Sequence, residues 1–363
     1  MKLLPTLVAG GLAAAAVASP LVPVSFQMPG LPASVTGYGA SGCGEWAGEP
    51  LDLGSRHVLF LSTSANLVAS DGNGAVLDLF RRDRKAGRTG LVSLTSSGRS
   101  GTRPVLAFSS AQSGDRVAFS WQSNDRAAGD TNGVEDVYVR DITAGTTRLV
   151  SARADGSGAG NAASGSPAMA SGGRYVAFQS EATDLVGAAE EDGNRAADIL
   201  LRDLETGTTE LISATPAGVP GDRASRLPII NHDGSVIVFQ SDALTLAPVE
   251  GYGTDLMVWS RASRSVTRVT IPGQTPRPPV RPLSTEQPVL SDDGRYLAFF
   301  IAVTGSSPVP APYSGVWWFD LTTGERLRAS GTTAVSLSDG EPSMSSDGRT
   351  LAFTVRSRPA VDA

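Results

Sequence analysis

Cysteine and histidine are almost absent from this chain of 363 residues, which contains one cysteine and two histidines. The single Cys43 can form no internal disulfide, so the chain is not a disulfide-stabilised scaffold. With His57 and His232, it provides too few ligands for a zinc cluster. The G-x-S-x-G pattern of an α/β-hydrolase nucleophile is also missing. The sequence therefore offers no zinc centre and no serine-hydrolase elbow.

An excess of positive charge is missing as well. Lysine and arginine total 30 and aspartate and glutamate total 36, which gives a net charge of -6 at pH 7. Proteins that bind nucleic acid through the phosphate backbone need clustered basic side chains. We therefore predict no nucleic-acid partner.

Long hydrophobic runs are confined to the amino end. The sequence MKLLPTLVAGGLAAAAVASP has one lysine, then an alanine-rich apolar stretch that closes on small residues, which is the layout of a signal peptide. The run is short for a membrane span, and Pro5 and two adjacent glycines weaken it as a permanent helix. We predict a signal peptide over residues 1–19 and a secreted or periplasmic protein with no membrane span in the mature chain. An uncleaved anchor is the alternative.

A repeat of about 60 residues dominates the sequence. Apolar segments end on a phenylalanine with spacings of 59, 59, 61, 60 and 54 residues, at Phe60, Phe119, Phe178, Phe239, Phe299 and Phe353. A proline stands eleven residues before four of them, at Pro167, Pro228, Pro288 and Pro342. Pro50 and Pro104 hold the equivalent place with altered spacing.

Each of the first five repeats contains four short segments that predict strands, which we name a, b, c and d in chain order. Strand a follows the proline, strand b ends near the phenylalanine, strand c is a D-x-x-x-R-D run such as residues 136–141, and strand d follows a glycine turn. The segments are rich in Val, Ile, Leu and aromatic residues and are bounded by Gly, Asp, Asn and Pro. Four-stranded antiparallel units repeated in tandem arrange radially as blades. We therefore predict an all-β, six-bladed β-propeller.

The repeats occupy residues 50–356, which we predict as the propeller domain, followed by a tail at residues 357–363. The last repeat has only strands a and b, over residues 342–344 and 350–355. We expect the segment of residues 20–49 to complete this last blade with strands within residues 22–39, so that both termini share one blade. The first strand a is then expected near Pro50.

The motif S-x-D-G-R-Y-x-A-F, as in residues 291–299, is followed in other repeats by D-x-N-G-x-x-D-V-Y-V-R-D and T-G-T-T. These motifs resemble the WD-like Pro-Asp repeats of TolB-type six-bladed propellers, and the likeness covers residues 50–356. The resemblance implies a propeller fold, in a family that includes scaffold, binding and enzyme-associated members. The fourth repeat departs from the pattern with EGYGTD, and the fifth has the proline-rich loop GSSPVPAPYSG.

Three loops between strands b and c alternate Asp and Asn beside a glycine turn. Ca²⁺ binds six to eight oxygen ligands, so these side chains are candidate Ca²⁺ ligands. The alternative is that Asp and Asn cap the turn through backbone N–H groups while the last Asp anchors strand c. The pattern also lacks the final glutamate of an EF-hand loop. The candidates are Asp71, Asn73 and Asp78 in the first repeat, Asp130, Asn132 and Asp136 in the second, and Asp192, Asn194 and Asp198 in the third.

The b–c and d–a connections are long, whereas the a–b and c–d connections are tight turns. Because the long loops share one end of a blade, we expect a binding surface on this long-loop face, around the mouth of the central channel. Candidate ligand-binding residues there are Arg126, Arg195, Arg223 and Arg226. The repeated strand-c pairs Arg82–Asp83, Arg140–Asp141 and Arg202–Asp203 are interpreted as structural, because catalysis would not need a copy per blade.

These patterns predict a non-enzymatic propeller whose long-loop face binds a protein, a peptide or a glycan. The alternative is an extracellular hydrolase or lyase that uses Arg and carboxylate groups at the channel mouth, with Ca²⁺ as an electrophile. No organic cofactor and no individual catalytic residue are predicted.

Overall fold

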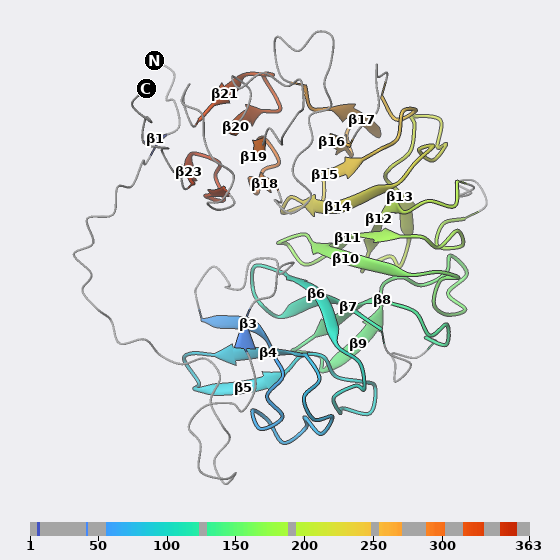
Figure 1. Ribbon diagram of the computed structural model, residues 1–363, viewed down its shortest axis with the longest axis vertical. Helices are drawn as coiled ribbons and strands as arrows, with labels where there is room; N and C mark the ends of the chain where they lie inside the picture. The colour runs from blue at the N-terminus through green and yellow to red at the C-terminus, as the bar shows by residue number, and fades with distance from the viewer. Residues whose placement is uncertain are drawn as a thin grey trace, which may run out of the picture. The chain divides into compact units, whose positions relative to one another are not determined.

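The computed structural model describes residues 6–7, 41–42, 56–122, 129–187, 194–247, 254–270, 288–301, 315–329 and 342–353. Within these ranges the regular elements are strands, and they form six sheets (Figure 1). Five sheets have four strands each in chain order, and the sixth has three. These sheets are the blades that the repeat pattern predicts.

The strands of the first three blades have the following bounds. The first blade contains β2 (Ser41–Gly42), β3 (His57–Ser62), β4 (Asp78–Asp83) and β5 (Arg88–Leu91). The second contains β6 (Val105–Ser110), β7 (Arg116–Trp121), β8 (Asp136–Asp141) and β9 (Thr146–Leu149). The third contains β10 (Ser164–Met169), β11 (Tyr175–Ser180), β12 (Asp198–Asp203) and β13 (Thr209–Leu211).

The remaining blades follow the same order. The fourth contains β14 (Ser225–Ile230), β15 (Val236–Ser241), β16 (Asp255–Ser260) and β17 (Ser265–Arg268). The fifth contains β18 (Val289–Leu290), β19 (Tyr296–Ile301), β20 (Gly315–Asp320) and β21 (Arg326–Arg328). The last combines β22 (Ser343–Met344) and β23 (Thr350–Ala352) with β1 (Thr6–Leu7).

The core lies between neighbouring sheets. The repeated phenylalanines of strand b are buried in the first five blades, at Phe60, Phe119, Phe178, Phe239 and Phe299. Phe119 belongs to a cluster that joins residues of the first and second blades, and Phe299 belongs to one that joins the fourth and fifth. A blade cannot bury both faces of its own sheet, so the neighbouring blades of each of these two clusters stabilise one another by packing.

Strand a contains a β-bulge at the repeated proline. In the third and fourth blades the strand register shifts between Gly165 and Ala168 and between Arg226 and Ile229. The residue before the proline has positive φ in both, 48° at Ser166 and 55° at Leu227. Proline has no N–H for the ladder and is confined to strand edges and bulges. In the third and fourth blades the repeated proline therefore marks a bulge in an edge strand.

The first and last blades differ in detail from the prediction. The partner of β3 is β2 at residues 41–42, through Ser41 with Ser62, whereas the expected strand near Pro50 lies outside the described residues. We placed the first strand a near Pro50 from its distance along the chain to Phe60. The open edge of β3, however, can pair with any short extended segment that reaches it, and β2 is such a segment.

The last blade joins both ends of the chain, as expected, but through another segment. The edge of β23 pairs in parallel with β1, through Thr6 with Thr350 and Leu7 with Leu351. The predicted closing strands within residues 22–39 lie outside the described residues. Because β1 lies inside the predicted signal peptide, cleavage there would remove it, and closure by residues 22–39 stays a prediction.

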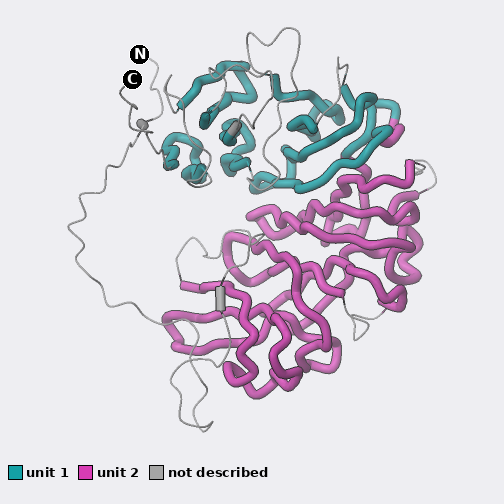
Figure 2. Tube along the Cα trace, viewed as in Figure 1, with its two compact units in different colours: residues 1–14, 213–217, 221–363 teal, residues 15–212, 218–220 magenta. Residues whose placement is uncertain are grey.

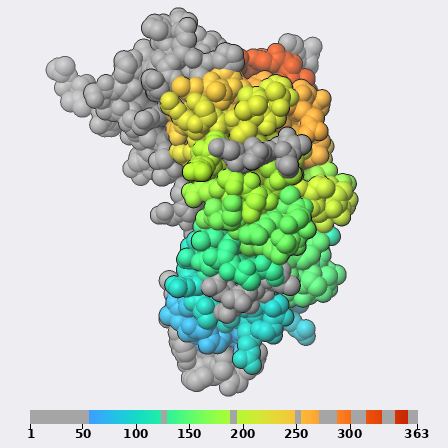
Figure 3. Space-filling model, turned by 90° about the vertical axis from the view of Figure 1, so that its right-hand side faces the viewer, coloured from blue at the N-terminus to red at the C-terminus, as the bar shows by residue number. Residues whose placement is uncertain are grey.

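The chain divides into two compact units (Figure 2). Unit 1 comprises residues 1–14, 213–217 and 221–363, and unit 2 comprises residues 15–212 and 218–220. Unit 2 holds the first three blades, and its surface runs from blue to green in chain order, so that successive blades are neighbours (Figure 3). Unit 1 holds the other three.

If the bulge strains the backbone at Ser166, a glycine at this position should make the protein more stable. Replacing Ser166 with glycine removes the clash of Cβ at φ 48°, so Ser166→Gly should raise the free energy of unfolding by about 1 kcal/mol. The matched control is Ala168→Gly, which lies in a regular pair with Ala177 and should lower stability by about 0.5–1 kcal/mol. Urea denaturation measures both. Equal destabilisation by the two substitutions would contradict a strained bulge.

Candidate functional site

The long loops leave one end of each blade, as the strand registers show. In the third blade, Ser180 at the end of β11 pairs with Asp198 at the start of β12. The same Ser180 pairs with Ser164 at the start of β10. The b–c loop and the d–a loop that precedes strand a therefore meet the blade at this end, which we call the long-loop end. The a–b and c–d turns lie at the opposite end, which we call the turn end.

A buried aspartate begins strand c at the long-loop end. Asp78, Asp136 and Asp198 are fully buried. The hydroxyl of Ser93, after strand d, donates to Asp78 Oδ1 at 2.7 Å and accepts the Leu79 N–H at 3.1 Å.

The second blade repeats this arrangement with Ser151. Its hydroxyl donates to Asp136 Oδ1 at 2.6 Å and accepts the Val137 N–H at 3.0 Å. We call Asp78 with Ser93, and Asp136 with Ser151, the Asp–Ser pairs. In both blades the pair fixes the end of strand d against the start of strand c.

Burial makes these carboxylates unusually basic. Burial raises the pKa of Asp78 to about 6, against the lowering effect of the Ser93 and Asn73 hydrogen bonds, and the charge of Asp71 raises it further. Burial likewise raises the pKa of Asp136 to about 7, and the charges of Asp130 and Glu135 add to the effect. In the first two blades the carboxyl group at the start of strand c therefore binds a proton more readily than an exposed aspartate does.

The asparagines of the first two b–c loops connect each loop to the d–a loop of the same blade. Asn73 Nδ2 donates to Asp78 Oδ2 and to the Gly101 carbonyl, both at 2.6 Å. Asn132 Nδ2 donates to the Gly160 carbonyl at 2.9 Å, and its Oδ1 accepts the Val134 N–H at 3.0 Å. Asn132 thus caps its own turn through a backbone N–H, whereas Asn73 connects its loop through the side-chain N–H groups.

The third blade has the same pattern in part. Asn194 Nδ2 donates to Asp198 Oδ2 at 2.7 Å, and Asn194 Oδ1 accepts the Ala196 N–H at 2.6 Å. Asp192 lies outside the described residues. Here too the asparagine caps the turn while the aspartate begins strand c.

The candidate arginines are divided between the two units. Arg195 belongs to unit 2, where it occupies a turn with φ 56°. In unit 1, Arg226 Nη2 lies 3.0 Å from Asp242 Oδ2, and Arg223 Nε lies 3.9 Å from Asp222 Oδ2. Arg126 lies outside the described residues. Two of the four candidates therefore lie beside a carboxylate: Arg223 beside Asp222 of the same loop, and Arg226 of β14 beside Asp242 at the end of β15.

Hydrogen bonds join the d–a loop of one blade to the b–c loop of the next. In unit 2, Asn161 Oδ1 accepts the Thr183 N–H at 2.9 Å, and the Asn161 N–H donates to Asp184 Oδ1 at 2.9 Å. In unit 1, Asp222 takes the same position, and its Oδ1 accepts the Leu244 N–H at 2.7 Å. The long loops on either side of a blade boundary therefore form one connected surface within each unit.

At the turn end, arginines at or just before the start of strand b meet the aspartates that end strand c. Arg174 Nη2 lies 2.7 Å from Asp203 Oδ2, and Asp203 Oδ1 accepts the Glu205 N–H of the c–d turn at 2.9 Å. The same ion pair recurs as Arg56–Asp83, Arg116–Asp141 and Arg295–Asp320. The strand-c arginines bond to strand-d threonines, in Arg82–Thr89, Arg140–Thr147 and Arg202–Thr209. Both residues of the predicted strand-c pairs are thus structural.

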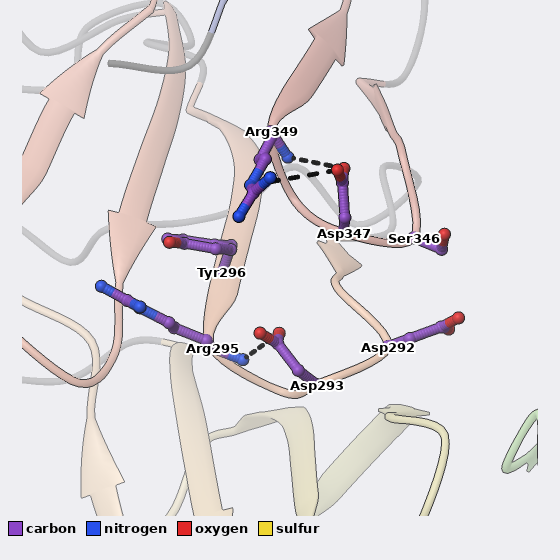
Figure 4. Close-up of a pocket in the computed structure, with 7 residues that line it drawn as sticks. All are labelled: Asp292, Asp293, Arg295, Tyr296, Ser346, Asp347 and Arg349. Atoms are coloured by element: carbon purple, nitrogen blue, oxygen red, sulfur yellow. Dashed lines mark hydrogen bonds and ion pairs between the residues drawn. The ribbon is translucent and has the colours of Figure 1, made fainter. Parts of the chain in front are cut away.

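A polar hollow of about 350 Å³ lies at the turn end of the last two blades (Figure 4). Arg295 is paired with Asp320 and lies over the Tyr296 ring, 4.9 Å from its centroid. Gly348 has φ 68°, and a Cβ there would lie 2.2 Å from the Tyr296 ring, so only glycine fits this turn. The lining residues are Asp292, Asp293, Arg295, Tyr296, Ser346, Asp347 and Arg349.

This hollow was not among the sites expected from the sequence. Its signal was visible as two neighbouring D-G-R turns, at residues 293–295 and 347–349. The charged groups are used within the turns, since Asp293 Oδ1 and Asp347 Oδ1 accept the N–H groups of Arg295 and Arg349. The hollow therefore arises where two a–b turns meet.

No long, apolar helix that could cross a membrane occurs in the ranges given above. Nor do the described histidine, cysteine, aspartate and glutamate side chains include a group of three or more placed to hold a metal ion.

If the Asp–Ser pair fixes strand d against strand c, loss of the Ser151 hydroxyl should lower the stability of the protein. Ser151→Ala leaves both the buried Asp136 Oδ1 and the Val137 N–H without this partner, so it should lower the free energy of unfolding by about 1–3 kcal/mol. The control is the exposed Ser157→Ala in the same d–a loop, with an expected change within about 0.5 kcal/mol. Thermal and urea denaturation measure the difference. A Ser151→Ala protein as stable as the control would contradict this role.

Because Arg174 and Asp203 form an ion pair, we expect the free energy of unfolding to fall in acid. Burial raises the pKa of Asp203, but Arg174 and the turn N–H groups lower it by more, to about 2. An unfolded aspartate has a pKa of about 3.9, so the stabilisation is present above about pH 4 and is lost as the pH falls towards 2.

Urea denaturation from pH 6 to pH 2 tests whether the stabilisation by Asp203 is lost as the pH falls. The Asp203→Asn protein should be less stable than the wild type at pH 6, and the gap should close near pH 2. The control Glu205→Gln changes an exposed carboxylate on the same arginine and should have little effect at any pH. An unchanged gap at pH 2 would contradict the assignment.

No family model matches this sequence, and no curated protein sequence matches it. Solved structures do resemble it. TolB from Acinetobacter baumannii is 18% identical with a TM-score of 0.42, and the likeness covers 77% of this chain and 54% of that one. The chain thus spans about half the length of that TolB.

Two further structures cover more of their own length. A putative TolB from Agrobacterium tumefaciens is 14% identical with a TM-score of 0.45, over 78% of this chain and 79% of that one. An oligogalacturonate lyase from Vibrio parahaemolyticus is 12% identical with a TM-score of 0.37, over 88% of each chain. The tandem four-stranded sheets make this chain an all-β propeller, as its repeats predict, and TolB propellers are among the structures that it resembles.

Proposed function

We propose that this protein is a non-enzymatic binding or scaffold propeller that acts in the periplasm or outside the cell. Its long-loop ends would bind a protein, a peptide or a glycan. The observation that carries the proposal is the hydrogen bonding of d–a loops to the b–c loops of the next blade, in Asn161 with Thr183 and Asp184, and in Asp222 with Leu244.

These bonds matter because loops that are already ordered lose little conformational entropy when a partner binds. Within a blade, Asn73 and Asn132 bond the b–c loop to the d–a loop. Between blades, Asn161 and Asp222 bond the d–a loop to the b–c loop of the next blade. A rigid scaffold that presents ordered loops is the usual arrangement of a binding surface.

The exposed groups of these loops are charged and of both signs. The Arg153 side chain is 43% exposed beside Asp184, and the Arg223 side chain is 40% exposed beside Asp222. Alternating charges favour a polar partner with hydrogen-bonding groups over an apolar one. A glycan or a polar segment of a protein or peptide has this character.

Charge reversal at the two ends of the blades tests the proposal. The long-loop variant carries Arg153→Glu and Arg223→Glu, and the matched control carries Lys85→Glu and Arg349→Glu at the turn end, with the same change in net charge. Glycan and peptide arrays identify ligands of the wild type, and biolayer interferometry then measures affinity. We expect the long-loop variant to bind about tenfold or more weakly and the control to bind unchanged. Equal affinity of the long-loop variant and the wild type would contradict the proposal.

A further inference from the structure

The b–c loops of the first three blades repeat one turn in which an asparagine is followed by a residue with positive φ. In the second blade Asn132 precedes Gly133 at φ 77°, and in the third Asn194 precedes Arg195 at φ 56°. Asn73 of the first blade is also followed by a glycine of positive φ. The same turn therefore occurs twice with glycine after the asparagine and once with arginine.

The side-chain amide of an asparagine can react with the backbone nitrogen of the next residue. That nitrogen loses its proton, bonds to the amide carbon and expels ammonia, which leaves a succinimide ring. Water then opens the ring to aspartate or isoaspartate. The covalent chain itself holds the two reacting atoms near each other, so the attack is an intramolecular step with a high effective concentration. A glycine at the next position has no Cβ to obstruct the attack.

Asn132 has a hydrogen-bond donor where charge develops in this reaction. Its Oδ1 accepts the Val134 N–H at 3.0 Å. Attack on the amide carbon places negative charge on that oxygen, and a backbone N–H at such a distance stabilises an oxyanion. Gly133 is exposed, so water can reach the succinimide. The turn of the second blade thus favours both the attack and the hydrolysis.

The other two loops each lack one of these features. Asn73 is followed by glycine, but its Oδ1 is buried and has no hydrogen-bond donor among the described residues. Asn194 Oδ1 accepts the Ala196 N–H at 2.6 Å, but the next residue is Arg195, which has a side chain. Of these three asparagines, Asn132 alone combines the following glycine with the donor.

We propose that Asn132–Gly133 is a self-modification site, at which the Gly133 nitrogen attacks the Asn132 amide and the side chain loses its nitrogen. The overall reaction consumes one water and releases one ammonia, and it yields aspartate or isoaspartate at position 132. It goes beyond the proposed binding function, because it needs no ligand.

The modification would release the b–c loop of the second blade from the d–a loop. Asn132 Nδ2 donates to the Gly160 carbonyl at 2.9 Å, and the same side chain bonds Asp136. An aspartate carboxylate has no N–H to donate, and it adds a negative charge next to the buried Asp136. Isoaspartate also adds a carbon atom to the main chain. The long-loop end of this blade would therefore loosen as the protein ages.

Peptide mapping by mass spectrometry tests the site in the full-length wild-type protein. The protein is incubated at pH 8, either folded or in guanidinium chloride, and the peptides that contain Asn73, Asn132 and Asn194 are followed over time. In the folded protein we expect Asn132 to lose its amide at least about tenfold faster than the other two. In guanidinium chloride the donor is lost, so Asn73 and Asn132 should react at similar rates.

A gain of reactivity in the third blade provides the matched variant. Arg195→Gly adds the missing glycine beside an Oδ1 that already accepts an N–H, so Asn194 should then react at a rate close to that of Asn132. The substitution suits the backbone, because Arg195 has φ 56°. Asn132→Asp reproduces one product, and its Tm should fall below that of fresh wild type and match that of aged wild type.

The proposal is overturned if Asn132 of the folded wild type reacts no faster than Asn73. It is also overturned if Asn194 stays unreactive in folded Arg195→Gly protein. Should that variant fail to fold, the comparison of Asn132 with Asn73 in the wild type still decides the matter. Ligand binding is measured on fresh protein, so a failure here leaves the proposed binding function to its own test.

Discussion

The burial of an aspartate at the start of strand c is the constraint on which the long-loop end of each of the first four blades depends. A carboxylate removed from water must find hydrogen-bond donors, and in the first two blades the serine after strand d provides one. The same hydroxyl accepts a strand-c N–H, so one serine fixes the relative position of two strands. The loops that leave these strands therefore start from well-defined positions.

The strand-c aspartates at the two ends of a blade have different partners. At the turn end, each described strand-c aspartate faces a partly exposed arginine and stays ionised, as in Arg174 with Asp203. At the long-loop end, Asp78 and Asp136 are buried among hydroxyl and amide groups, and burial raises their pKa values. The turn end therefore holds ionised aspartates in ion pairs, whereas the long-loop ends of the first two blades hold buried aspartates that bind a proton more readily.

The sequence predicted the parts of the fold that repeat. Buried phenylalanines, strand-c aspartates and glycine turns recur in phase, so the strands and their order followed from spacing alone. The two-residue strands β1 and β2 have no periodic signal, because their pairing depends on which open sheet edge lies near. The serine partners of Asp78 and Asp136 lie fifteen residues away and were missed, although Ser93 and Ser151 also recur in phase. Which arginines pair with neighbouring carboxylates, as Arg226 does with Asp242, depends on side-chain geometry that spacing does not encode.

Amide hydrogen exchange of the wild-type protein tests most directly whether polar bonds order the long loops. The N–H groups that side chains accept at this end belong to Leu79, Val137, Thr183 and Leu244. If the loops are ordered as described, these amides exchange as slowly as those of the central strands β7 and β11. Exchange of the Thr183 and Leu244 amides at the rate of an exposed, unstructured loop would contradict the account.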